Sequence, residues 1–311
     1  MKKIFIFILT LAIVDFAFSQ QEYQFTQNMF NHFGTNPGYA GFNKAICVNL
    51  QGRNQWMGFG GEPKTYQLTI DGYVNPLMGG LGLTVYKDIL GASDRTYVKG
   101  AYAYNFIVGK GNLGIGLQLG LLNEVIDFSK FKAFDANDPV ISSKSKASDM
   151  FFDLNFGVFY EIQNKIYFGA SSTQMIEGKG FKGFSETNAV EQNARHYYFT
   201  AGYTFNASSK IDVLPSVFVK SDGASTQFDL SALVLFDKKF WGGASYRYQD
   251  AVAFLVGMYF KSYKIGLSYD FTTSEIGKNN YSNGSWEVMA SYCFKIVPVY
   301  KPTGHHTTRF L

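Results

Sequence analysis

Apolar and polar side chains alternate with a period of two along most of the chain after about residue 45. The pattern is clear near the C-terminal end, where large apolar residues alternate with other residues: Trp286, Val288, Ala290, Tyr292 and Phe294 with Glu287, Met289, Ser291 and Cys293. A strand with this pattern has one apolar face and one polar face, because successive side chains point to opposite sides. Repeated segment after segment, it predicts a sheet between an apolar surrounding and a polar interior.

The composition indicates that the apolar surrounding is lipid. Aromatic residues make up 18% of the chain and charged residues 17%, whereas soluble domains carry about 25% charged residues. After residue 19 no apolar run is long enough for a transmembrane helix. The predicted fold is therefore all-β, a transmembrane antiparallel up-and-down β-barrel in the outer membrane of a Gram-negative bacterium.

About fourteen strands are predicted, an even number, as in single-chain bacterial barrels. They span residues 46–56, 65–74, 80–90, 94–108, 112–128, 148–162, 165–172, 196–206, 211–221, 227–236, 240–248, 251–259, 263–271 and 285–294. Short turns mostly alternate with longer links such as 173–195. Since long loops of such barrels face outward and short turns face the periplasm, both ends of the mature chain are expected in the periplasm.

Three segments lie outside the predicted barrel of residues 46–294. Residues 1–19 carry Lys2 and Lys3, an apolar run and small residues at the end, which predicts a cleaved signal peptide. Residues 20–45 contain Pro and Gly residues that disfavour a strand, and they are rich in aromatic residues, so they are expected to pack in the lumen or at its periplasmic mouth. Residues 295–311 are expected to form a periplasmic tail.

The two cysteines are expected to be neighbours. Cys47 begins the first predicted strand and Cys293 ends the last, both on the inward face. Barrel closure pairs these strands, and the periplasm permits disulfides. Either a disulfide or two buried free thiols would satisfy the pattern, since cross-strand geometry often departs from that of a disulfide.

Charged residues on predicted inward faces are expected to line the lumen, because a charge facing lipid costs roughly 2–4 kcal/mol at the midplane. They are Arg53, Lys99, Asp153, Glu161, Asp229, Arg247, Asp270 and Glu287. Both signs are present, which favours a network of opposite charges that fills the interior over a track for a substrate. Bulky inward residues such as Tyr86, Phe159 and Tyr198 would also fill it.

Two loop surfaces are candidates for contact with a protein partner. Trp56, Phe59 and Pro63 lie among glycines at the outer rim of the first hairpin, where aromatic residues can anchor a partner. An interfacial aromatic girdle with a tight loop is an equally good interpretation. Phe181 and Phe184 in the loop 173–195 form the second candidate surface.

Enzymatic and nucleic-acid functions find little support. The chain has four His residues and two Cys residues, without a Gly-x-Ser-x-Gly or His-Glu-x-x-His pattern, so no catalytic site, metal site or cofactor is expected. The net charge is only +4, without a long basic run, which argues against nucleic acid as a partner.

Several motifs resemble the PorP/SprF family of type IX secretion system outer-membrane proteins over essentially the whole mature chain up to Phe294. They are Gln27, Met29 and Asn31, then Asn36–Gly41, Arg53–Thr65, Arg195–Tyr198, Phe240–Arg247, Tyr269–Ser274 and Gly284–Met289. Gly38 stands where the family pattern has Ala, and the chain beyond Phe294 is longer than the usual ending.

The resemblance implies a non-enzymatic part in type IX secretion or gliding motility. The expected partners are other type IX secretion proteins, or a large secreted adhesin whose C-terminal domain the barrel anchors, together with outer-membrane lipid. The alternative is a passive outer-membrane channel for small solutes, which would need an open, water-lined bore.

Overall fold

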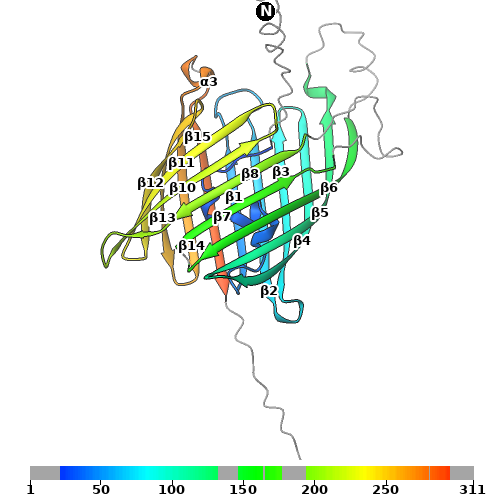
Figure 1. The fold of residues 1–311 in the computed structure, drawn as a ribbon. Coiled ribbons are helices and arrows are strands. Elements are labelled where there is room, and N and C mark those ends of the chain that lie inside the picture. The colour runs from blue at the N-terminus through cyan, green and yellow to red at the C-terminus, as the bar shows by residue number, and fades with distance from the viewer. Residues whose placement is uncertain (1–21, 132–145, 164, 177–193, 280, 295–311) are drawn as a thin grey trace, which may run out of the picture.

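The computed structural model describes residues 22–131, 146–163, 165–176, 194–279 and 281–294. It is a closed antiparallel β-barrel (Figure 1). Its strands are β1 (Ile46–Asn54), β2 (Lys64–Val74), β3 (Gly79–Leu90), β4 (Ser93–Val108), β5 (Gly111–Asp127), β6 (Lys146–Ile162), β7 (Ile166–Thr173), β8 (His196–Tyr203), β9 (Phe205–Asn206), β10 (Ile211–Ser221), β11 (Thr226–Phe236), β12 (Phe240–Arg247), β13 (Ala251–Phe260), β14 (Tyr263–Thr272) and β15 (Ser285–Phe294).

Short helical turns complete the described chain. They are η1 (Asn28–Phe30), η2 (His32–Gly34), η3 (Pro37–Tyr39), η4 (Asn75–Leu77), η5 (Phe128–Lys130) and α3 (Glu275–Lys278). No helix in these ranges is long and apolar enough to cross a membrane.

The ring closes where β1 pairs with β15, in a register that runs from Ile46 opposite Phe294 to Asn54 opposite Trp286. Strands β8 and β9 form one crossing, because both pair with β10 in the same register. The barrel therefore has fourteen crossings, which confirms the predicted fold class.

The strand predicted over residues 196–206 is interrupted at Thr204. Ser216 of β10 still pairs with Gly202. The residue before it, Pro215, lies at the break in the pairing. Proline has no N–H to donate, so the ladder loses a hydrogen bond at this point.

The outer face of the barrel is apolar, as the alternation predicts. Leu117, Phe199 and Trp286 are 55%, 45% and 40% exposed. Their neighbours one residue along the strands, such as Gln118, Tyr198 and Glu287, point inward and are buried. An apolar exterior on every side is the surface that lipid covers.

Leu117→Arg is expected to lower the free energy of unfolding by about 2–4 kcal/mol, because Leu117 lies near the middle of β5 and would place a charge at bilayer depth. Urea titration of the barrel refolded in lipid vesicles measures the loss. Val108→Arg is the matched control, since Val108 is the last residue of β4 on the same outward face and an interfacial charge costs about 0–1 kcal/mol. Equal losses at both positions would contradict the assigned membrane depth.

Residues 22–44, which we call the luminal strap, run inside the ring of strands. Figure 1 shows this segment in dark blue within the barrel. Its side chains and backbone bond to opposite parts of the wall: the Asn31 amide donates to Gln51 of β1 at 2.8 Å, and the Asn36 amide donates to the Val158 carbonyl of β6 at 2.9 Å.

The luminal strap spans the length of the barrel. Glu22 contacts Thr173 and His196, where β7 and β8 meet the long loop 174–195. Ile46 pairs with Phe294 at the opposite end, which carries the short turns. The first and last residues of the described chain, Glu22 and Phe294, therefore lie at opposite ends of the barrel, because the strap runs through the lumen.

Candidate functional site

Inward glycines make room for the luminal strap. A Cβ atom at Gly116 would overlap the Pro37 backbone, and one at Gly80 would overlap the Ala40 carbonyl. A side chain at either position would therefore displace the strap. The sequence contained this signal as runs of inward Gly in residues 113–121, which the alternation alone does not distinguish from a small polar face.

Five of the predicted luminal charges form one buried network near the loop end of the barrel: Arg53, Asp229, Arg247, Asp270 and Glu287. Arg53 lies 2.7 Å from Asp270 and 3.4 Å from Glu287. Arg247 lies 3.1 Å from Asp270 and 3.3 Å from Asp229. The opposite charges thus compensate each other inside the barrel, as buried charges must.

The luminal strap takes part in this network through Thr26. Its backbone N–H donates to Glu287 at 2.7 Å, and its hydroxyl donates to Asp270 at 2.8 Å. The same hydroxyl accepts a hydrogen bond from Arg53 at 2.8 Å. Strap and wall are therefore joined at fully buried polar atoms, where an unmade hydrogen bond is costly.

A second buried cluster forms around Glu22, a residue that the sequence did not single out. Lys99 lies 2.7 Å from Asp153 and 3.8 Å from Glu22. The Tyr198 hydroxyl donates to Glu22 at 2.5 Å, and the Lys220 ammonium donates to its carbonyl at 2.5 Å. Burial raises the pKa of Glu22, but the nearby Lys99 and His196 and the hydrogen bond from Tyr198 outweigh it, so the pKa lies below its usual value.

The predicted luminal carboxylate Glu161 lies apart from both clusters. It is half-buried near the short-turn end of β6, opposite Tyr167 of β7.

Apolar side chains fill the lumen between the polar clusters and the short-turn end. Phe159, Leu233, Leu255 and Met289 are at most 1% exposed although they point inward. Tyr86 is likewise buried, stacked on Tyr97 with ring centroids 4.2 Å apart. A water-lined bore would leave such wall residues exposed, so the described part of the lumen is packed at this level.

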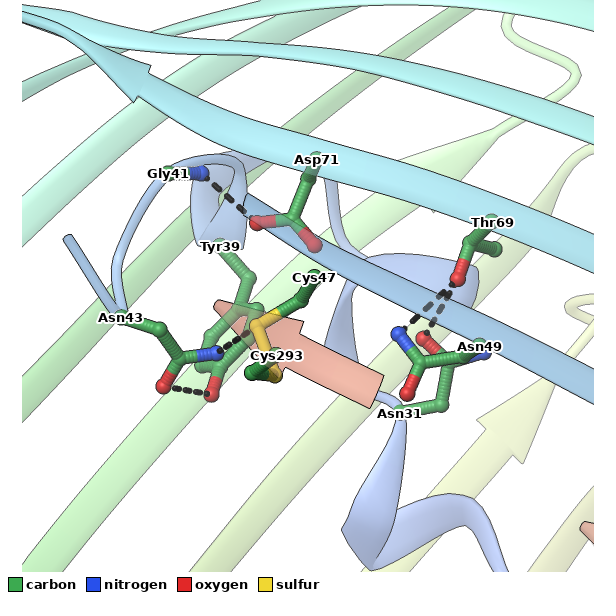
Figure 2. The surroundings of a disulfide bond; sticks show 9 residues. All are labelled: Asn31, Tyr39, Gly41, Asn43, Cys47, Asn49, Thr69, Asp71 and Cys293. Carbon is green, nitrogen blue, oxygen red and sulfur yellow. Dashed lines mark hydrogen bonds between the residues drawn. A yellow bond between two sulfur atoms is a disulfide. The ribbon is translucent and has the colours of Figure 1, made fainter. Parts of the chain in front are cut away.

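Cys47 and Cys293 are bonded to each other across the closing strand pair (Figure 2). Their Cα atoms are 4.1 Å apart and their sulfur atoms 2.07 Å. The Asn43 amide nitrogen at the end of the luminal strap lies 3.5 Å from the Cys47 sulfur. Of the two interpretations that the sequence left open, the structure has the disulfide.

The double substitution Cys47→Ser/Cys293→Ser is expected to lower the free energy of unfolding by about 2–4 kcal/mol, because it releases a cross-link between distant parts of the unfolded chain. Its 246-residue separation makes the loop long. Urea titration with and without dithiothreitol measures the effect. The native protein should lose stability on reduction and the variant should not; equal response of both would contradict the bond.

The rim loop, residues 55–63, is held in place by the neighbouring loop between β14 and β15. The Met57 N–H donates to the Gly284 carbonyl at 2.8 Å, and the Asn283 N–H donates to the Met57 carbonyl at 2.7 Å. Within the loop, the Gly58 N–H donates to Glu62 at 2.9 Å, and this hydrogen bond keeps the pKa of Glu62 below its usual value.

The predicted partner-contact residues of the rim loop differ in how exposed their side chains are. Phe59 is 41% exposed, while Trp56 and Pro63 are half-buried. Phe181 and Phe184 lie outside the described residues.

Within the described ranges, no group of three or more His, Cys, Asp and Glu residues could hold a metal ion. His196 is engaged in the lumen, where its ring nitrogens lie 3.2 Å from the Glu22 backbone nitrogen and 3.2 Å from the Gln174 side-chain oxygen. The contact with Glu22 joins the luminal strap to the wall.

The model of the type IX secretion system membrane proteins PorP/SprF matches residues 17–292 of the chain. The chain belongs to the PorP/SprF family. This membership confirms the predicted resemblance and places the protein among secretion-system membrane proteins. No curated protein matches the chain.

Solved outer-membrane barrels resemble this PorP/SprF member at low identity. The outer membrane protein Omp33 of Acinetobacter baumannii is 8% identical, with a TM-score of 0.46 over 81% of this chain and 99% of that one. The CymD monoaromatic hydrocarbon channel is 11% identical, with a TM-score of 0.47 over 88% and 93%. The KdgM porin is 11% identical, with a TM-score of 0.39 over 80% and 99%.

Proposed function

We propose that this PorP/SprF member is a non-enzymatic docking protein of the outer membrane. It holds another type IX secretion component, or the C-terminal domain of a secreted surface adhesin, at the membrane. In this proposal residues 1–19 are removed on export, the long loops face the cell exterior, and the short turns and residues 295–311 face the periplasm.

The observation that carries the proposal is the filled lumen. Thr26 and Gln27 of the luminal strap are 0% exposed, and Phe33 is 1% exposed. A barrel whose own chain occupies its interior is suited to presenting surfaces rather than to passing solutes. The family membership supplies the secretion context.

The rim loop is the proposed contact surface for the partner. Its backbone is held by hydrogen bonds to the neighbouring loop, so a partner binds without first ordering it. Phe59 offers an exposed aromatic ring, the type of side chain that dominates binding energy at protein interfaces.

Capture of partners from mildly solubilised outer membranes tests the proposal. Tagged native barrel is expected to retain type IX secretion proteins or a large secreted adhesin, identified by mass spectrometry, and Phe59→Ala is expected to weaken retention about tenfold or more. Phe205→Ala is the matched control, because Phe205 is exposed on the outer face in β9 at the short-turn end. Retention of no such protein by the native barrel would overturn the proposal.

The alternative, a passive channel for small solutes, makes a different prediction. Large steady currents from the purified native barrel in a planar bilayer would favour the channel and count against the docking proposal.

A further inference from the structure

A groove of about 340 Å³ lies at the loop end of the barrel, between the rim loop and the turn that joins β3 to β4. Glycines form much of its wall, including Gly58, Gly60, Gly61 and Gly91. Phe59, Ile89, Glu62 and Lys64 complete its lining. We call it the glycine groove.

The glycine groove is preformed. The Gly91 N–H donates to the Gly61 carbonyl at 3.0 Å, which ties the two turns together. Gly61 and Gly91 have φ angles of 84° and 57°, a region that suits glycine and strains other residues. Together with the Gly58–Glu62 hydrogen bond, these contacts fix the backbone on both sides of the groove.

Unused backbone donors line this groove. Within the described chain, the N–H groups of Gly60 and Gly61 donate no hydrogen bond. A Cβ atom added at Gly60 would meet nothing within 4 Å, so the backbone there is open to an incoming molecule. Consecutive free donors are the groups that the carbonyl oxygens of a polypeptide segment can satisfy.

The charges of the groove compensate each other. Lys64 lies 3.4 Å from Glu62, and Glu62 also accepts hydrogen bonds from Gly58 and Asn54. No uncompensated charge is thus left to select an anionic lipid headgroup. Phe59 and Ile89 add apolar surface for a side chain of the bound segment.

We propose that the glycine groove binds an extended segment of a partner polypeptide. Its main-chain carbonyls accept hydrogen bonds from Gly60 and Gly61, and an aliphatic or aromatic side chain packs against Phe59 and Ile89. This inference rests on the proposed docking function and names the chemistry that the docking surface recognises.

A random decapeptide library displayed on phage, selected against the detergent-solubilised native barrel, is the probe. Enriched peptides should share an aliphatic or aromatic residue. Binding of a synthetic copy should shift the ¹⁵N-glycine amide signals of Gly60 and Gly61. Gly60→Leu, which places a bulky side chain beside the free N–H groups, should weaken its binding about tenfold or more, because it would obstruct the two hydrogen bonds and the apolar contact.

Two variants serve as controls. Gly60→Ala should retain most binding, since its methyl group meets no neighbour within 4 Å. Ala224→Leu places the same side chain on the exposed turn between β10 and β11 and should leave binding unchanged. Failure to enrich peptides, or equal binding by Gly60→Leu, would overturn the groove proposal. The proposal would also be overturned if phospholipid copurified with the native barrel and the two control variants but not with Gly60→Leu.

The groove and the docking function can fail separately. If Gly60→Leu retains the captured secretion partner while Phe59→Ala loses it, the docking proposal stands and the groove proposal falls. If the native barrel captures no secretion partner, the docking proposal falls whatever the peptides do.

Discussion

A barrel that lacks residues 23–43 is expected to conduct ions across a planar bilayer, whereas the intact barrel stays closed. The luminal strap contributes Phe25, Thr26, Phe33 and Ala40 to the buried interior, at exposures of 6%, 0%, 1% and 0%. Its removal would leave a polar wall with charges on it, which water would enter. Single-channel recording of the refolded barrel measures the change as discrete current steps.

The test needs evidence that the shortened barrel is folded. A folded barrel that has not been heated migrates differently from the unfolded chain in a detergent gel, and this difference provides the evidence. Gly116→Trp is a second variant that keeps the strap sequence, because its side chain would displace the strap at Pro37. Gly116→Trp should also raise the conductance above that of the native barrel. A folded barrel without the strap that conducts no better than the native protein would contradict the role of the strap as a plug.

Arg53→Met is expected to lower the free energy of unfolding by about 3–5 kcal/mol, the usual loss when one partner of a buried ion pair is removed. Arg53 is 3% exposed and pairs with Asp270 and Glu287, which would retain buried negative charge next to the strap. Equilibrium unfolding in urea with lipid vesicles measures the loss.

An exposed pair provides the contrast. Lys239→Met removes the partner of Asp237 on a short turn, where the side chains are 64% and 49% exposed, and should cost about 0–1 kcal/mol. Adding Glu287→Gln to Arg53→Met should recover part of the stability, because it removes one of the uncompensated charges. A loss near zero for Arg53→Met would show that the luminal network contributes nothing to the fold.

The wall of the barrel could be predicted from the sequence because a lipid-facing strand must alternate. One-residue shifts would turn Leu117 or Trp286 toward a polar lumen, so the pattern specifies the register of each strand. The predicted strand ends agree with the structure to within a few residues, and the largest departure, at Thr204, follows from Pro215 on the neighbouring strand.

That Cys47 and Cys293 lie next to each other could be predicted from barrel closure alone, since the first and last strands of a barrel must pair. The sequence did not decide between a bond and two thiols, because that depends on the separation of two side chains within fractions of an ångström.

The path of the luminal strap could not be predicted. It has no period, since its three short 3-10 turns are held by contacts with the wall rather than by its own pattern. For the same reason Glu22 and Lys220 were missed as members of a luminal cluster. They meet only once the strap is threaded through the barrel.

The strap also constrains how the molecule assembles. The strap precedes every wall strand along the chain and lies inside the ring, whereas β15, the strand that closes the ring on β1, is the last strand of the described chain. Once β15 has paired with β1 and the disulfide has formed, the strap can reach its place only by threading end-on through a closed ring. Insertion of this protein is therefore a problem of timing as well as of strand pairing.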